Sequence, residues 1–467
     1  MGSTAPSLVT TSTTTADARV TGPDETFMLV EALAGVETPI QMGWVFSDDP
    51  GESAVDDIHA RLAASPVHRR IAVTRMPFAR HRWVPAGPPE PVRLDLDPVA
   101  PEQVSRWFAD HLDGTSVRPT QGHSWHVATA PTSDGGRVVS VLASHVVCDG
   151  SGLRRALLTD RDAAHAAASA GSRGRIRDDL RDAGGQLVAA ARAVARLVGA
   201  AAASVRTGAD GTDDGPVVVE LDRPSPVPSP PGSSAVQGDP PVQHLLVTLD
   251  ADAFAARAAA RGGTANSLFC ALVGGVAQRA GIPEGDTTAI CIAVNRRAGD
   301  DDARANASGG VWIRTRGGLD GPVDLAGIRA QTRRALTEYT ERGAEMSADN
   351  VQPVVRLLPS RVVLALTGLI PAPHTTVSNL GAVEPELLRM GGQTAHVQFT
   401  RAAVRGMSAD DRRRRCRPGL LAWLTVHGDT ATMAVCGVDP DRFGTPGALR
   451  DHVEAELVAW DLPHAVL

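Results

Sequence analysis

The spacing of apolar residues along the chain follows two different periods, and each period predicts one type of element. Compact apolar runs rich in β-branched residues, such as residues 137–144 (RVVSVLAS) and 287–295 (TTAICIAVN), are typical of buried strands. Apolar residues repeated every three or four positions predict helices. Helices are expected at residues 54–64, 101–112, 151–160, 251–261, 266–280, 325–342 and 446–460, and further strands at residues 41–46, 243–249, 310–315, 375–381, 420–427 and 430–437. Helices and strands are mixed in both halves, which predicts an α/β (α+β) fold.

The pattern breaks at residues 161–240, where the composition changes. An Ala-rich stretch comes first, and residues 185–205 within it predict a helix that packs on the body or, as an alternative, makes peripheral contact with a membrane or lipid. Gly, Pro, Ser and Asp then dominate up to residue 241, which indicates a linker. The chain is therefore expected to consist of a disordered lead-in (1–23), an N-terminal subdomain (24–160), this connecting segment (161–240) and a C-terminal subdomain (241–467).

Composition narrows the classes of function. The 467 residues are 43% hydrophobic and carry a formal net charge of -7, so no basic excess exists to recruit nucleic acid. The five cysteines never form a C-x-x-C pair, and the sequence therefore predicts neither a disulfide framework nor a zinc site, and a reducing cytoplasm as the location. The sequence contains no run of about 18 apolar residues, so no membrane span is expected.

The stretch 141–150 (VLASHVVCDG) carries the candidate chemistry. His145 stands where the strand 137–144 gives way to a turn, followed three residues later by Asp149 and Gly150. A strand end fixes the backbone while the turn exposes the imidazole, which suits a general base. Gly150 is expected to relieve the backbone where it bends sharply. The pattern His-x-x-x-Asp-Gly also occurs by chance around a structural histidine. The context in the rest of the sequence must therefore decide between a structural and a catalytic role for His145.

That context is a resemblance to a known superfamily. Residues 144–150 (SHVVCDG) resemble the HHxxxDG motif of the acyltransferases that include chloramphenicol acetyltransferase, peptide-synthetase condensation domains and bacterial wax ester synthase/diacylglycerol acyltransferases. The similarity covers about residues 24–160 and 240–462. The other features that carry it are the acidic and apolar segment 25–31, Trp125, Asn266 at the head of an apolar helix, Arg297 after a strand, and the Ser378-Asn379 turn.

The resemblance implies two chloramphenicol-acetyltransferase-like domains with a central tunnel, and it implies roles for these residues. His145 would be the general base in the tunnel. Asp149 would pair with an arginine, for which Arg297 is the candidate and its neighbour Arg296 the residue to exclude. Neither a metal nor a resident cofactor is implied, because the acyl group arrives as a thioester substrate on coenzyme A or an acyl carrier protein.

The remaining roles each have a structural alternative. Ser378 or Asn379 would donate a hydrogen bond to the oxyanion, or would only satisfy the backbone of a turn. Trp125 and Asn266 are candidates for substrate binding, although a tryptophan in a wall and an asparagine that caps a helix are equally simple interpretations. For Arg297 the alternative is a solvated surface arginine.

Two departures from the family pattern shape the functional hypotheses. Ser144 replaces the first motif histidine, usually credited with structure, and residues 123–125 (HSW) replace Pro-Leu-Trp, which alters the expected acyl-binding surface. The single tyrosine, the eight phenylalanines and the unusual linker favour a smaller or more polar acceptor than a fatty alcohol or diacylglycerol. The first hypothesis is an O-acyltransferase that uses an acceptor alcohol. The second is an amide-forming, condensation-like enzyme that uses an acceptor amine. The third, prompted by Ser144, is a binding or scaffold protein whose catalytic apparatus has decayed.

Overall fold

The computed structural model describes most of the chain, and a few segments lie outside the description. The described residues are 19–159, 176–206, 218–220, 239–283, 285, 287–297, 299, 302, 304–316, 325–342, 353–355, 357–358, 362–363, 372–415 and 418–467. Most of the expected lead-in and most of the expected linker therefore lie outside it. None of the described helices combines the length and the apolar content that a membrane span requires.

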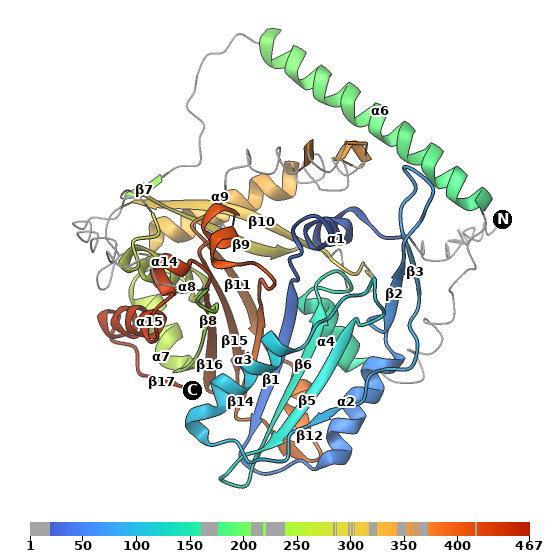
Figure 1. Cartoon of the computed structure of the whole chain (residues 1–467). Coiled ribbons are helices and arrows are strands. Elements are labelled where there is room, and N and C mark those ends of the chain that lie inside the picture. The colour runs from blue at the N-terminus through green and yellow to red at the C-terminus, as the bar shows by residue number, and fades with distance from the viewer. Residues whose placement is uncertain are drawn as a thin grey trace, which may run out of the picture.

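A five-stranded sheet forms the framework of the N-terminal half (Figure 1). Its strand order is β14 (Val397–Ala402), β1 (Pro39–Phe46), β6 (Arg137–Ser144), β5 (Trp125–Pro131), β4 (Arg93–Leu94). Every residue of β1 and β6 is buried, as expected for strands covered on both faces. Helices α2 (Glu52–Ala64) and α4 (Gly150–Leu158) pack on one face, and α3 (Val104–Gly114), preceded by a short 3₁₀ turn (Pro101–Gln103), packs on the other.

An eight-stranded sheet forms the framework of the C-terminal half. Its strand order is β17 (His464–Val466), β8 (Gln243–Asp250), β16 (Thr430–Gly437), β15 (Leu420–His427), β11 (Thr375–Ala382), β9 (Thr287–Asn295), β10 (Ser308–Arg316), β7 (Val218–Glu220). Helices α7 (Ala251–Ala260), α8 (Ala265–Arg279) and α15 (Ala448–Ala459) lie together on its outer side, and α9 (Ala326–Arg342) packs beside β10 (Figure 1). Their apolar side chains form the largest core of the molecule with the sheet.

One strand from the C-terminal half completes the N-terminal sheet. Strand β14 comes from late in the chain, yet it pairs with β1 in antiparallel register, Met42 opposite Thr400, and so completes the N-terminal sheet. It also contacts β15 and β16 of the other sheet. Helix α12 (Pro385–Leu388) and the short ribbon of β12 (Arg389–Met390) and β13 (Gln393–Thr394) precede it and join the N-terminal core. The junction between the sheets therefore contains β14.

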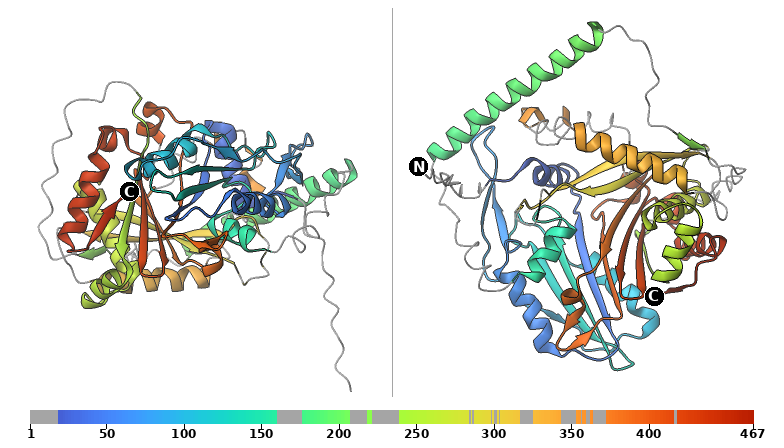
Figure 2. Two further views of the ribbon diagram at one scale, coloured as in Figure 1. Left: turned by 90° about the horizontal axis from the view of Figure 1, so that it is seen from below. Right: turned by 180° about the vertical axis from the view of Figure 1, so that it is seen from behind.

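The long helix α6 (Ile176–Arg206) runs along the outside of the molecule beside the ribbon of β2 (Arg69–Ala72) and β3 (Arg82–Pro85) (Figures 1 and 2). Asp182 pairs with Arg80, and Asp179 pairs with Arg19 and Arg82. The helix also exposes apolar side chains, namely Ile176, Leu180, Leu187, Val188 and Val194. Peripheral contact of this region with lipid stays a prediction.

The remaining elements frame the two sheets. Helix α1 (Gly22–Ala34) precedes β1, its first turn closed by a capping box between Thr21 and Asp24. Helices α13 (Ala409–Arg415) and α14 (Pro440–Phe443) contact one another in the C-terminal half.

Candidate active site

The motif loop is held at both ends by backbone hydrogen bonds. The His145 amide donates to the carbonyl of Thr38 at 3.0 Å, which continues the pairing of β6 with β1 for one residue. Four residues later Asp149 is the N-cap of α4, and its Oδ1 accepts a hydrogen bond from the Gly152 amide at 2.8 Å. A strand end and a helix start therefore fix the loop that carries the imidazole.

Asn306 determines which nitrogen of His145 carries the proton. The Asn306 amide nitrogen donates to Asp24 Oδ1 at 2.9 Å and to the His145 carbonyl at 2.7 Å. Both partners are acceptors, so the amide orientation is fixed and Oδ1 is the atom 2.9 Å from His145 Nδ1. Because that oxygen only accepts, Nδ1 must carry the hydrogen, and Nε2 keeps its lone pair.

The His145 ring is also held by packing. The ring of Phe27, from α1, stacks on the imidazole with centroids 4.0 Å apart and planes inclined by 19°. Burial lowers the pKa of His145, and the charge of nearby Asp149 opposes this effect without reversing it. The imidazole is therefore neutral at neutral pH, which is the protonation state that a general base requires.

Asp149 is engaged in hydrogen bonds on both carboxylate oxygens. Its Oδ2 accepts from Arg297 Nη1 at 2.8 Å, from the Ala307 amide at 2.9 Å and from the Ser308 hydroxyl at 3.1 Å. The expected ion pair with Arg297 is present, with side chains only 5% and 4% exposed. Burial alone would raise the Asp149 pKa, but the bonds from Arg297 and the backbone outweigh it and lower that pKa. Asp149 thus braces the loop through both of its oxygens.

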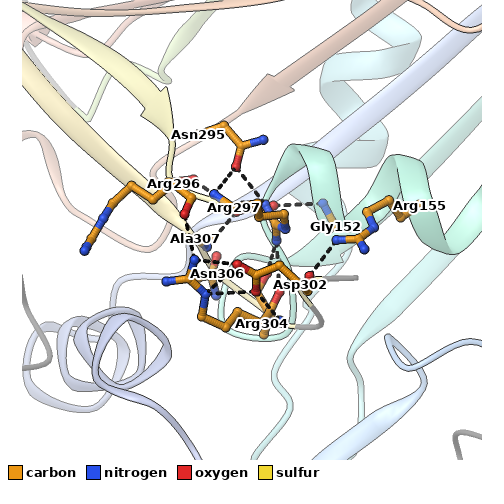
Figure 3. A network of polar contacts seen from close by, with 12 residues as sticks. Gly152, Arg155, Asn295, Arg296, Arg297, Asp302, Arg304, Asn306 and Ala307 are labelled. Atoms are coloured by element: carbon orange, nitrogen blue, oxygen red, sulfur yellow. Dashed lines mark hydrogen bonds and ion pairs between the residues drawn. The ribbon is translucent and has the colours of Figure 1, made fainter. Parts of the chain in front are cut away.

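Figure 3 shows how Arg297 connects the β9–β10 loop to α4. Its Nη2 donates to the carbonyls of Arg304 and Ala305 at 2.9 and 3.0 Å, and the Ala305 carbonyl also accepts the Asp149 amide at 3.2 Å. From α4, Arg155 donates to the Asp302 carbonyl at 2.6 Å. The C-terminal half therefore supplies the groups that brace the loop of the N-terminal half.

His145 lines a cavity of about 690 Å³. The walls come from both halves and include Thr38, which precedes β1, Thr400 of the N-terminal sheet, and Thr376 and Trp423 of the C-terminal sheet. A cavity of this size accommodates a small organic molecule.

The structure brings some of the predicted site residues to this cavity. Gly150, Arg297, Ser378 and Asn379 line it together with His145 and Asp149. The Asn379 side-chain oxygen accepts from the Gly381 amide at 3.0 Å, which leaves its amide nitrogen as a donor. Within the described chain the Ser378 hydroxyl has no hydrogen-bond partner.

Trp125 and Asn266 lie elsewhere. Trp125 is buried in β5, donates to His68 Nδ1 at 3.1 Å and lines a separate cavity of about 390 Å³. Asn266 lies in the first turn of α8 and faces α9 across a shallow depression. Neither lines the cavity of His145, and their assignment to substrate binding stays a prediction.

One residue of the motif has a different role from the one expected. The explanation given for Gly150 was wrong, because its backbone is not left-handed and a Cβ there would find its nearest neighbours at 3.8 Å. Gly152 is the constrained glycine, since a Cβ would lie 3.0 Å from the Cys148 Cβ and 3.3 Å from the Ala305 carbonyl oxygen. Ser144 is buried, and its hydroxyl accepts from the Val146 amide at 3.3 Å. Arg296 is excluded as the partner of Asp149, because its guanidinium lies over the Tyr339 ring.

Asn306, Asp24 and Phe27 were not predicted as site residues. Asn306 carries no motif of its own in the sequence, and it reaches His145 only because β10 starts beside the motif loop. Asp24 is visible in the sequence as a residue of an acidic helix start, but that signal indicates a cap and not a site. Only the tertiary contacts show that Phe27 and Asn306 hold His145 and that Asp24 holds Asn306.

The fold is shared with condensation domains and with a wax ester synthase/diacylglycerol acyltransferase, as comparison with solved structures shows. The first condensation domain of the CDA synthetase is 14% identical over 97% of this chain and 100% of that chain, with a TM-score of 0.56. The wax ester synthase/diacylglycerol acyltransferase from Marinobacter aquaeolei VT8 is 13% identical over 95% of this chain and 98% of that chain, with a TM-score of 0.54. The resemblance predicted from the sequence is thus confirmed at the level of the fold.

A third similar structure is the starter condensation domain of rhizomide synthetase in complex with C8-CoA, which is 14% identical over 95% of this chain and 94% of that chain, with a TM-score of 0.51. No family model and no curated protein matches the sequence.

Proposed function

We propose that the protein transfers an acyl group from a coenzyme A or carrier-protein thioester to an acceptor hydroxyl, with His145 as the general base. The observation that carries this proposal is the fixed tautomer of His145. Asn306 occupies Nδ1, and Nε2 keeps its lone pair on a side chain that lines a cavity of about 690 Å³. The shared fold of condensation domains and a wax ester synthase supports the same type of reaction.

The reaction would need one proton carrier. The acceptor hydroxyl gives its proton to His145 Nε2 as its oxygen attacks the thioester carbonyl carbon. The tetrahedral intermediate then collapses, the carbon–sulfur bond breaks, and the imidazolium returns the proton to the departing thiolate. While His145 is cationic, the Asn306 oxygen continues to accept from Nδ1, so the ring keeps its orientation through both steps.

The negative charge that develops on the carbonyl oxygen needs a donor. The Ser378 hydroxyl and the Asn379 amide nitrogen both belong to residues that line the cavity, and each is left available by its local contacts. Removal of one oxyanion donor typically costs about 10²-fold to 10³-fold in kcat. Ser378 and Asn379 are the residues proposed for this role.

An amide product is the second candidate, because condensation domains are among the similar structures. In that reaction an acceptor amine takes the place of the hydroxyl, and His145 serves in the same way. A complex of one such domain with C8-CoA supports coenzyme A thioesters as the first donors to test.

The experiment compares the parent with His145→Gln on a matrix of acyl-CoA donors and of alcohol and amine acceptors. Thiol release gives the rate, and mass detection separates ester from amide. His452→Gln is the matched control, since His452 lies on α15 and does not line the cavity. We expect the parent and the control to form product, and His145→Gln to be slower by about 10²-fold to 10⁴-fold.

Each outcome decides between the hypotheses. An ester product supports the first proposal, and an amide product from amines alone replaces it with the second. Equal background thiol release from the parent and His145→Gln, without product, would identify a binding protein whose chemistry has decayed.

A further inference from the structure

One cation of the cavity wall makes no ion pair with any described residue. Arg401 is in β14, where the two sheets meet, and it is 0% exposed. It lines the cavity that contains His145. Its Nε donates to Gln41 Oε1 at 2.8 Å, whereas Nη1 and Nη2 have no hydrogen-bond partner in the described part of the chain.

The groups around Arg401 position the guanidinium without neutralising it. The Gln41 amide nitrogen donates to the Phe108 carbonyl at 2.8 Å and to the Ser140 hydroxyl at 2.9 Å, so Gln41 must present its oxygen to Arg401. The network continues from Ser140 to His111, whose pKa burial lowers to about 2, so this ring is neutral. The hydrogen-bonded network therefore contains no anion; the Asp113 carboxylate acts electrostatically on Arg401 but makes no ion pair with it.

A histidine on the C-terminal sheet also lacks hydrogen-bond partners. Both ring nitrogens of His244, on β8, are buried without a partner among the described residues. Burial and the charge of Arg401 lower the pKa of His244, which keeps this ring neutral. Burial lowers the pKa of Arg401 to about 10, and the guanidinium remains a cation at neutral pH. A buried cation without an ion-pair partner is costly, and its cost falls when an anion binds at its free N–H groups.

We propose that Arg401 binds a carboxylate carried by the substrate, so that this cavity accepts an anionic reactant and not a neutral lipid alone. The inference rests on the proposed function, because it names the substrate class of the same cavity. The planar guanidinium offers Nη1 and Nη2 side by side, a geometry that matches the two oxygens of a carboxylate. The carboxylate belongs either to the acceptor, as in a hydroxy acid or amino acid, or to the acyl group, as in a dicarboxylic thioester.

Binding of matched probes tests the inference on the full chain. The acceptor probes are ω-hydroxy acids of increasing length, each paired with the primary alcohol of the same length. The donor probes are succinyl-CoA and butyryl-CoA, which differ in a terminal carboxylate. Calorimetry and thermal shift measure affinity without turnover, and the arm in which the charged probe binds better identifies which reactant carries the carboxylate.

Three variants define the role of Arg401. Arg401→Met removes the cation, Arg401→Lys keeps the charge without the fork, and Arg154→Met removes an arginine of the same cavity wall that already pairs with Glu384. We expect the charged probe to bind the parent and Arg154→Met at least about tenfold more tightly than its neutral partner. This preference falls below about twofold in Arg401→Met and is intermediate in Arg401→Lys.

Equal binding of charged and neutral probes by the parent in both arms would overturn the inference, and this comparison needs no variant. A preference that survives in folded Arg401→Met would overturn it as well. The variant His145→Gln separates the two proposals. If His145→Gln keeps the carboxylate preference while neither the parent nor any variant forms product, the acyltransferase proposal fails and the anion site stands.

Discussion

The side chain of Asn306 accepts a hydrogen bond from the imidazole of His145, although 161 positions separate the two residues in the chain. Asn306 lies two residues before β10 in the C-terminal half, and His145 follows β6 in the N-terminal half. The tautomer of the candidate base is therefore set across the boundary between the two sheets. Asp24 completes the arrangement because it fixes the Asn306 amide in turn.

Asn306→Ala should impair the chemical step and not binding. Without the amide oxygen, Nδ1 loses the acceptor that holds its proton, and both tautomers of His145 become populated. We expect kcat to fall about tenfold to hundredfold with little change in KM, as for the loss of an orienting partner of a general base. Steady-state kinetics on folded protein measures this, and an unchanged kcat would show that the hydrogen bond is only structural.

The pH dependence of activity follows from the pKa of His145. Burial lowers this pKa below its usual value of 6.5, so the imidazole remains a neutral base at pH values where an exposed histidine is largely protonated. We expect kcat/KM to be level at neutral pH and to decline on the acid side with an apparent pKa beneath 6.5. A decline centred above 6.5 contradicts this assignment, and His452→Gln should give the parent profile.

Arg297→Met should destabilise the fold, because it leaves the Asp149 carboxylate buried without its cation. The expected loss is about 3 to 5 kcal/mol in the free energy of unfolding, measured by urea denaturation at neutral pH. Arg296→Met is the matched control: the contact of this guanidinium with the Tyr339 ring contributes only about 1 kcal/mol.

The sign of the pH effect on this difference also follows. The pKa of Asp149 is lowered in the folded state, so the stability that its ion pair contributes is present above the usual carboxyl pKa and disappears as the pH falls through the lowered one. The gap between the parent and Arg297→Met should therefore narrow in acid. A gap that stays constant down to strongly acidic pH would rule out the ion pair as its cause.

Gly152→Ala and Gly150→Ala form a pair that separates packing from helix propensity. Both residues lie in the first turn of α4, but only at Gly152 would a Cβ press on the Cys148 Cβ, at 3.0 Å, and on the Ala305 carbonyl. We expect Gly152→Ala to lose about 1 to 3 kcal/mol of stability and Gly150→Ala to lose less than about 0.5 kcal/mol, both by urea denaturation. Equal losses of stability would mean that the loop at Ala305 shifts at little energetic cost to make room for the added methyl group.

Local patterns were sufficient for most of the elements. Strands β6, β9, β15 and β16 begin and end where the apolar runs do, and helices α2 and α15 begin and end within two residues of the expected bounds. These segments bury a regular face, so their spacing alone determines them. Helix α6 begins nine residues earlier than expected, and its start carries acidic residues that bind the β2–β3 ribbon.

The rest depends on contacts that no local pattern contains. Strand β14 was not predicted because it carries polar residues, Gln398 and Arg401, at buried positions, which hides the alternation typical of a strand. His145 and Asp149 were predicted as a site from the motif, and Arg297 from the resemblance. Asn306 required the structure, because a single asparagine in a loop carries no signal until the residue that it contacts is known.

The pairing of β14 with β1 sets an order of assembly during synthesis. The ribosome makes β14 about 350 residues after β1, so the edge of β1 that β14 covers stays unpaired over that interval. The last hydrogen-bonded row of the N-terminal sheet closes only after β14 has left the ribosome. Over the same interval this open edge is a site where other unpaired strands can add.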